Sequence, residues 1–328
     1  MCYARLDHSP GGARHVRTGG EALITAIFPR AATSSTFRYP LWPGSKWRNA
    51  APEQSIAFTI DWEHRPHVFT LLTVQWRTMP SGRAAIATAF AHLPADSEVW
   101  ITSSFGTPLR RLTPCVAEAV SWSARPAESP SERTRGVLLV HEWGFPHPAS
   151  KLIEREAQRR NWTLVHDCAH AFNHGVELAK AGATVTFSLP KLFPVPMGGL
   201  LASRSMGLSE SGPGATASGS FHEDWGSRLL EEAKERSAQQ IRNWHRLDRL
   251  IGGFGLGGLD RLPPGVVPQV YRVRLAKQFA ASQCFASHSI ETAPPFYTGW
   301  LAIPCHAELP ASYWDDVRAA VATAALSS

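Results

Sequence analysis

Short apolar runs alternate with amphipathic stretches through the middle of the chain. Continuous apolar runs predict buried strands at 98–102, 136–141, 163–166, 184–188 and 199–202. Helical spacing of apolar residues predicts helices at 81–93, 112–120 and 149–160. Strands that are apolar along their whole length lie in a sheet with both faces covered. The pattern therefore predicts an α/β domain with a mainly parallel sheet sandwiched by helices.

The composition changes along the chain and predicts its domain organisation. Residues 1–55 are rich in Pro, Gly and Arg and predict an irregular N-terminal extension. Residues 56–205 form the large domain, which begins with β-prone runs at 56–58 and 67–74. Residues 204–220 are small, polar and Gly-rich, as in a linker or mobile loop. Residues 221–328 predict a small C-terminal α+β domain with a helix at 225–250, strands at 270–274 and 300–303, and a helix at 311–325.

Composition and charge argue against several classes of protein. Apolar residues make up 44% of the chain and charged residues 18%, which is typical of a folded protein. No apolar run approaches the roughly 18 residues that span a bilayer, and no apolar stretch follows the basic N-terminus. We therefore expect a cytoplasmic protein with no membrane partner.

The charge pattern gives no sign of a nucleic-acid or metal site. The net charge is +6, but the 33 Lys and Arg residues are spread among 27 acidic residues without a basic stripe. We therefore expect no nucleic-acid partner, although an anionic substrate or cofactor is favoured. His166, Cys168 and His170 alternate at a strand end and face different ways, so no metal site is expected.

Two residues with chemical potential follow predicted strands. Active sites in such sheets lie beyond the C-terminal ends of the strands. Asp167 directly follows the strand at 163–166, and Lys191 follows the strand at 184–188, so both can reach one pocket. Pyridoxal phosphate (PLP) chemistry requires a Lys that forms a Schiff base and a carboxylate that keeps the pyridine nitrogen protonated. Taken singly, Asp167 could cap a helix and Lys191 could be a solvated surface residue.

Further features suit a ring that carries a phosphate. The stretch SGRAA at 81–85 places a Gly turn at the start of a predicted helix, where N–H groups and the helix dipole favour an anion. Ser188 offers a hydroxyl group, and Phe105, after the strand at 98–102, could stack on the ring. Trp143 comes soon after another strand end and could line the substrate pocket.

Two long segments resemble the DegT/DnrJ/EryC1/StrS family of fold-type-I PLP-dependent sugar aminotransferases. They are VHEWGFPHPASKLIEREAQRRNWTLVHDCAHAF at 140–172 and TVTFSLPKLFPVPMGGLLAS at 184–203. SGRAA is similar to the family's phosphate-binding helix start, and LAIPCH at 301–306 to its late Leu-Pro-x-His stretch. The matching positions are Val140, His141, Gly144, Asp167, Ala169, His170, Ser188, Lys191, Gly198 and Gly199.

The resemblance implies the fold-type-I fold, PLP as the cofactor and a homodimer. It implies that Lys191 holds PLP as a Schiff base, that Asp167 binds the pyridine nitrogen and that His170 contacts the ring hydroxyl side. The residues that would hold the phosphate are Ser188, Gly82, Arg83 and Ala84. The implied activity is transfer of an amino group from an amino acid, with glutamate as the expected donor. The acceptor would be a keto group of a nucleotide-linked sugar or a secondary-metabolite intermediate.

Departures from the family pattern keep other activities open. Met197 stands before Gly198, where an acidic residue is common, and the family's Asn-x-Arg segment after the Lys is missing. A PLP-dependent lyase or decarboxylase, or other carbanion chemistry in a biosynthetic pathway, is therefore an alternative. A degenerate non-catalytic relative is a second alternative. Reaction of the bound cofactor with glutamate distinguishes the first two activities, and failure to bind PLP indicates the third.

Overall fold

The structure is a computed structural model of the chain. It describes residues 68–103, 109–120, 128–204, 219–256, 258, 262–274, 278–293 and 300–326. The predicted N-terminal extension, the β-prone run at 56–58 and most of the predicted linker lie outside the described residues.

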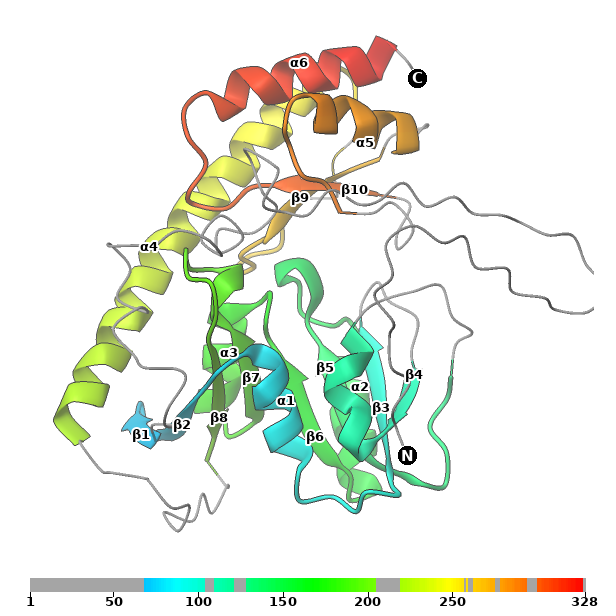
Figure 1. Cartoon of the computed structure of the whole chain (residues 1–328), viewed down its shortest axis with the longest axis vertical. Coiled ribbons are helices and arrows are strands. Elements are labelled where there is room, and N and C mark those ends of the chain that lie inside the picture. The colour runs from blue at the N-terminus through cyan, green and yellow to red at the C-terminus, as the bar shows by residue number, and fades with distance from the viewer. Residues whose placement is uncertain are drawn as a thin grey trace, which may run out of the picture.

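An eight-stranded sheet forms the base of the molecule, in the order β1-β2-β8-β7-β6-β5-β3-β4 (Figure 1). Its strands are β1 (Val68–Leu71), β2 (Val74–Met79), β3 (Glu98–Ser103), β4 (Leu109–Leu112), β5 (Thr134–Val140), β6 (Thr163–Asp167), β7 (Thr184–Ser188) and β8 (Gly199–Ser203). Strands β3, β5, β6 and β7 pair in parallel. β8 is antiparallel to both β7 and β2, so β2 runs in the same direction as the parallel group. The mainly parallel sheet predicted from the sequence is confirmed, with antiparallel strands β1 and β4 at its edges.

Helices cover both faces of this sheet because successive strand residues point to opposite sides. On one face, α1 (Gly82–Phe90) packs on alternate strand residues such as Leu138 and Val165. On the other face, Leu139 packs against α2 (Ser150–Arg159), and Phe187 packs against α3 (Phe172–Lys180) and the first half of α4 (Gly219–Gly252). The predicted helix at 112–120 is a 3-10 helix, Thr113–Val120.

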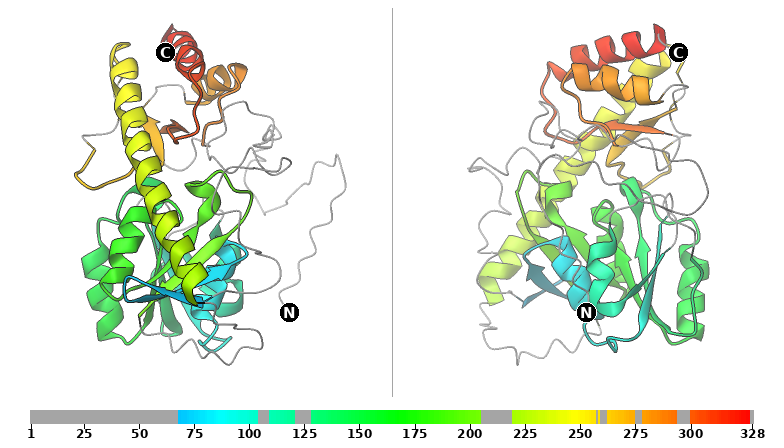
Figure 2. Two further views of the ribbon diagram at one scale, coloured as in Figure 1. Left: turned by 90° about the vertical axis from the view of Figure 1, so that its left-hand side faces the viewer. Right: turned by 45° about the vertical axis from the view of Figure 1, so that its right-hand side comes forward.

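The second group of elements lies beyond the C-terminal ends of the parallel strands (Figures 1 and 2). The 34-residue helix α4 runs from the large sheet to this group. Here β9 (Val270–Val273) and β10 (Leu301–Pro304) form an antiparallel pair, covered by α5 (Gln278–Ser287) and α6 (Tyr313–Leu326). We keep the predicted names, large domain and small domain, for these two groups. No helix in the described part of the chain is long and apolar enough to cross a membrane.

Three differences from the predicted elements have physical causes. The run at 67–74 is divided into the hairpin β1–β2, because Leu72 (φ 55°) and Thr73 (φ 60°) form a tight left-handed turn. Such turns usually contain Gly or Asn, so these residues gave no turn signal. Helix α3 was not predicted, although Phe172, Val176 and Ala179 lie on one buried face at helical spacing. Strand β4 and helix α5 were not predicted either.

The packing of α3 on the sheet gives a stability prediction. A Cβ atom on Gly175 would lie 2.5 Å from the Phe187 ring and 2.7 Å from Cys168 Cβ, whereas one on Gly252 would meet nothing within 4 Å. We expect Gly175→Ala to lower the free energy of unfolding by about 1–3 kcal/mol, because overpacking forces buried groups apart. Gly252→Ala, at the end of α4, is the matched control and is expected to leave stability equal or slightly higher. Denaturant unfolding measures both, and equal stabilities of the two variants would contradict the close packing.

Candidate active site

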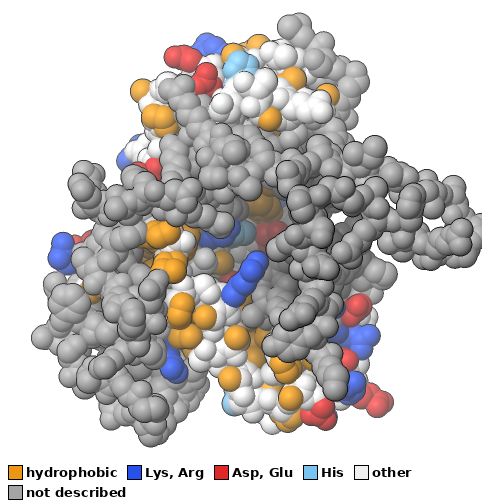
Figure 3. Space-filling model, in the orientation of Figure 1, with side chains coloured by type: hydrophobic (Ala, Val, Ile, Leu, Met, Phe, Trp, Pro, Cys, Tyr) orange, Lys and Arg blue, Asp and Glu red, His pale blue; other side chains and the backbone are white. Residues whose placement is uncertain are grey.

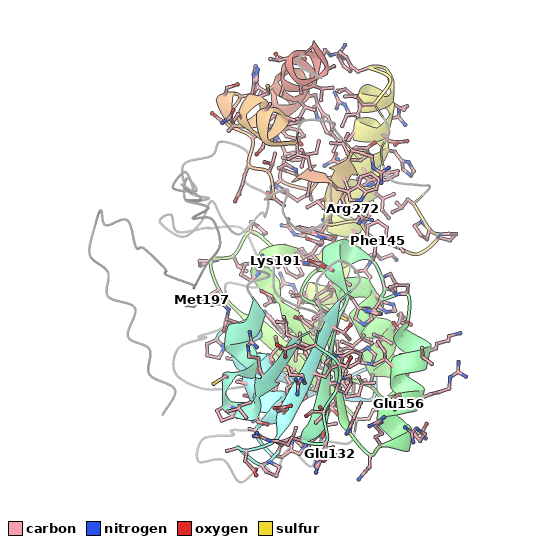
Figure 4. The ribbon with its side chains drawn as sticks, turned by 90° about the vertical axis from the view of Figure 1, so that its right-hand side faces the viewer. Glu132, Phe145, Glu156, Lys191, Met197 and Arg272 are labelled. Atoms are coloured by element: carbon pink, nitrogen blue, oxygen red, sulfur yellow. The ribbon has the colours of Figure 1, made fainter. Side chains whose placement is uncertain are left out.

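The candidate site lies at the edge of the large sheet where the parallel strands end. Strand β7 leads directly into the short 3-10 helix η6 (Leu189–Lys191), which carries Lys191. Figure 4 shows Lys191 and Phe145 at this edge, facing Arg272 of the small domain, with Glu132 at the opposite end of the sheet. Figure 3 shows a hollow between the two domains at this level, with charged side chains inside it.

Asp167 is the last residue of β6 and supplies a buried carboxylate. Its side chain is 4% exposed, and Oδ1 accepts a hydrogen bond of 3.0 Å from the Ala169 N–H group. Burial raises the pKa of Asp167 to about 6, against the opposing effects of the Ala169 hydrogen bond and the positive charge of Lys191. The carboxylate therefore lies within electrostatic reach of Lys191, and a cationic partner would favour its ionised form.

Helix α1 begins beside the end of β7. Ser81 caps the helix, and its Oγ accepts a hydrogen bond of 3.1 Å from the Ala84 N–H group. A Cβ atom on Gly82 would lie 2.9 Å from Ser188 Cβ, so the first turn of the helix lies against Ser188. The N–H groups of a first helical turn have no partner within the helix, and the dipole there favours an anion. The Ala84 N–H is used by the cap, so Gly82 and Arg83 are the better placed amide donors.

Gly198 and Gly199 allow the start of α1 to come this close. Gly198 (φ 113°) donates its N–H to Pro80 O and accepts from the Leu189 N–H, each over 3.0 Å. A Cβ atom on Gly199 would lie 2.5 Å from the Ser81 carbonyl oxygen. Any side chain on Gly199 would therefore push the start of α1 away from the segment that carries Lys191.

His170 is held by Trp143. Its Nδ1 accepts a hydrogen bond of 3.2 Å from the Trp143 N–H, and the two rings stack with centroids 5.4 Å apart. Because Nδ1 accepts, the neutral ring carries its proton on Nε2, which is then a donor. Burial, followed by the charge of Lys191, lowers the pKa of His170 well below its usual value, so the ring is neutral.

These contacts place most of the predicted residues together. Lys191 lies within electrostatic reach of both Asp167 and His170, and Gly82 lies against Ser188. The Arg83 side chain is exposed, so only its backbone is suited to the predicted role. Phe105, the predicted stacking ring, lies outside the described residues.

Sequence reasoning missed a charged pair that faces the site from both domains. Arg272 on β9 is 3% exposed, and its guanidinium lies 4.7 Å from the centre of the Phe145 ring. Burial lowers the pKa of Arg272 to about 10, while the charge of buried Glu142 opposes this shift. An Arg within an otherwise apolar strand is a signal that could have identified this position.

A chain of buried histidines lies next to Asp167. His141 Nε2 is 3.0 Å from His166 Nδ1, and His141 Nδ1 accepts a hydrogen bond of 3.1 Å from the His147 N–H. Burial lowers the pKa of His141 to about 2 and that of His166 to about 4. Within the described residues, no group of three or more His, Cys, Asp or Glu side chains is arranged to hold a metal ion. The histidines form a neutral hydrogen-bonded network under the site.

Comparison with known proteins identifies the fold. No family model and no curated protein sequence matches this chain. The solved structures include PseC of Helicobacter pylori, an aminotransferase involved in the biosynthesis of pseudoaminic acid, with 14% identity over 77% of this chain and 87% of that one and a TM-score of 0.56. A DegT DnrJ EryC1 StrS aminotransferase from Brucella abortus has 12% identity over 76% and 85% of the chains and a TM-score of 0.53.

A third structure carries the cofactor in its description. A protein of Streptococcus pneumoniae, described as a sugar aminotransferase in the PLP form, has 15% identity over 77% of this chain and 87% of that one and a TM-score of 0.55. At these identities the likeness shows the fold. The chain has the fold of the fold-type-I PLP-dependent transferases, which confirms the predicted fold class.

The histidine network gives a pH prediction. The folded pKa of His166 is lowered from 6.5 to about 4, so its stabilising effect is complete above pH 6.5 and is lost as the pH falls towards 4. Over this range the free energy of unfolding should fall less steeply in His166→Gln than in the wild type, by about 1.4 kcal/mol per pH unit. Other titrating groups largely cancel in the difference. The exposed His245, changed to Gln, is the control, and parallel curves for wild type and His166→Gln would exclude a neutral buried His166.

Proposed function

We propose that this chain is a PLP-dependent aminotransferase, with the cofactor attached covalently to Lys191 Nζ. The observation that carries the proposal is the grouping of Lys191, Asp167 and His170 beside a helix start that lies against Ser188. A buried carboxylate, a neutral imidazole donor, a primary amine and an anion-attracting helix start match the different parts of PLP. The fold, shared with aminotransferases, supports the same assignment.

Each residue suits one part of the cofactor. Bound PLP supplies an electron-withdrawing ring that stabilises negative charge on the substrate carbon that loses its proton. Asp167 accepts a hydrogen bond from the ring nitrogen and favours its protonated form, and His170 donates from Nε2 to the ring hydroxyl side. The Ser188 hydroxyl and the Gly82 and Arg83 amides hold the phosphate.

Lys191 has a second task as a proton carrier. Once its amine is released by the incoming substrate, Nζ is positioned to take the proton from the substrate Cα and return it elsewhere. The positive charge that Nζ then carries is balanced by Asp167, which lies within its electrostatic reach. The small domain lies over this edge of the sheet, with buried Phe145 and Arg272 contacts between the two domains, and excludes water from the proton transfer.

The substrate assignment extends the proposal. We propose an amino acid donor, with glutamate first, and a keto acceptor on a nucleotide-linked sugar or a secondary-metabolite intermediate. The similar structures include a protein described as a sugar aminotransferase, which supports this class of acceptor. A cytoplasmic homodimer is part of the same proposal, because sites of this fold type are completed at a subunit interface.

Attachment to Lys191 is tested by absorbance and chemical trapping. The wild-type protein with PLP is expected to be yellow, and borohydride reduction should leave the adduct on the peptide that contains Lys191. Lys191→Arg keeps the charge but cannot form the bond, so its absorbance should match that of free PLP. Lys180→Arg, at an α3 lysine paired with Glu177, is the matched control and should behave as wild type. An adduct on any other lysine would contradict the assignment.

The reaction type is tested with glutamate in a single half-reaction. An aminotransferase should convert the bound cofactor to its pyridoxamine form and release 2-oxoglutarate, in amounts equal to the number of sites. Asp167→Asn should slow this conversion by at least about a hundredfold, because ring protonation is then unsupported. Release of carbon dioxide or an eliminated group instead would favour the lyase or decarboxylase alternative. A protein that stays colourless with PLP would indicate a non-catalytic relative.

A further inference from the structure

Trp143 has a backbone conformation that needs an explanation. It lies in η5 (Glu142–Gly144), directly after β5, with φ 59° and ψ 18°. This left-handed conformation costs a non-glycine residue about 1–2 kcal/mol. Trp143 is nevertheless 8% exposed and packed, so tertiary contacts hold it there. Residues strained in this way are concentrated at functional sites.

The contacts that hold Trp143 come from both domains. On the large-domain side, its N–H donates to His170 Nδ1 and its ring stacks on the His170 ring at 18°. On the small-domain side, its carbonyl accepts a hydrogen bond of 2.9 Å from the Gln269 N–H. Its ring also packs in a cluster with Val270 and Ala302 of the β9–β10 pair. One residue therefore joins a site histidine to the small domain.

The next residue locks the same turn. Gly144 has φ 92°, and a Cβ atom on it would lie 2.0 Å from the Val267 carbonyl oxygen. The chain at 267–269 thus contacts both Trp143 and Gly144 and leaves the turn little freedom. The N–H of Trp143 is aimed at His170 only while this turn is left-handed.

We propose that Trp143 is a positioning residue that holds His170 with its proton on Nε2 and couples that arrangement to the position of the small domain. The proposal rests on the proposed function, in which His170 donates to the cofactor. Without the Trp143 N–H, either ring nitrogen of His170 could carry the proton, and half of the histidine population could present an acceptor instead. Movement of the small domain that displaces Gln269 would then weaken cofactor binding through Trp143.

The arrangement also explains why His170 stays neutral at the site. Protonation at Nδ1 would remove the acceptor of the Trp143 N–H and leave that buried donor without its partner. The lowered pKa of His170, caused by burial and by the charge of Lys191, acts in the same direction. A neutral His170 donates one proton from Nε2 over the working pH range.

The first test reads the His170 ring in the protein without cofactor. Ring nitrogen NMR shifts, assigned by their loss in His170→Gln, report which nitrogen carries the proton. Wild type should show the Nε2–H form. Trp143→Ala should show a mixture, because alanine pays for the left-handed turn without the ring that held it. Trp143→Gly adopts the turn without that cost and should recover most of the Nε2–H form.

The second test measures PLP affinity by absorbance titration of the same proteins. Trp143→Ala should bind PLP about tenfold more weakly, as expected for one misdirected hydrogen bond to a charged or polar group. Trp143→Phe keeps a stacking ring and should stay within about threefold of wild type, so it also serves if the alanine variant does not fold. Trp162→Ala is the matched control, because this partly exposed Trp lies at the other end of β6.

The outcomes separate the two proposals. Unchanged tautomer and unchanged PLP affinity in Trp143→Ala, or equal losses in Trp162→Ala, would overturn the positioning role. A wild-type protein that binds no PLP would overturn the proposed function, while the NMR result would still decide the link between Trp143 and His170. A Phe variant as impaired as the Ala variant would show that the ring plays no part.

Discussion

The close approach of β8 to the start of α1 is the constraint on which the candidate site depends. Gly199 leaves no space for a side chain beside Ser81, and Gly198 uses a backbone conformation that favours glycine. Through the bonds of Gly198 to Pro80 and Leu189, this strand start ties the helix start to the segment that carries Lys191. The amine and the anion-attracting helix end thus share one backbone framework. A bulkier residue at Gly199 would separate the two.

The second feature is the placement of charge and neutral polar groups in a buried edge. Asp167 is a buried acid whose ionised form is favoured by the Lys191 charge, and burial keeps His170 neutral. The histidine chain through His141 and His166 satisfies hydrogen bonds behind Asp167 without adding charge. A protonated histidine there would compete with Lys191 for the carboxylate. The neutral network therefore preserves the pairing on which the proposed chemistry relies.

The third feature is the link between the domains. The long helix α4 connects them covalently, but contacts near Trp143, Phe145 and Arg272 bring the small domain onto the site edge. Trp143 contacts a proposed cofactor-binding residue and the small domain together. Domain position and cofactor binding are thereby connected in one short turn, which is how a site between two domains can respond to closure.

The sequence by itself determined the strand and helix alternation, the mainly parallel sheet and the positions of Asp167 and Lys191 at strand ends, because periodicity and strand order are local properties of the chain. It did not determine the β1–β2 turn, where Leu72 and Thr73 adopt a conformation usually taken by Gly or Asn. Only the tertiary structure decided the tautomer of His170, the strained turn at Trp143 and the buried position of Arg272. These properties arise from contacts between segments far apart in the sequence, which no local pattern records.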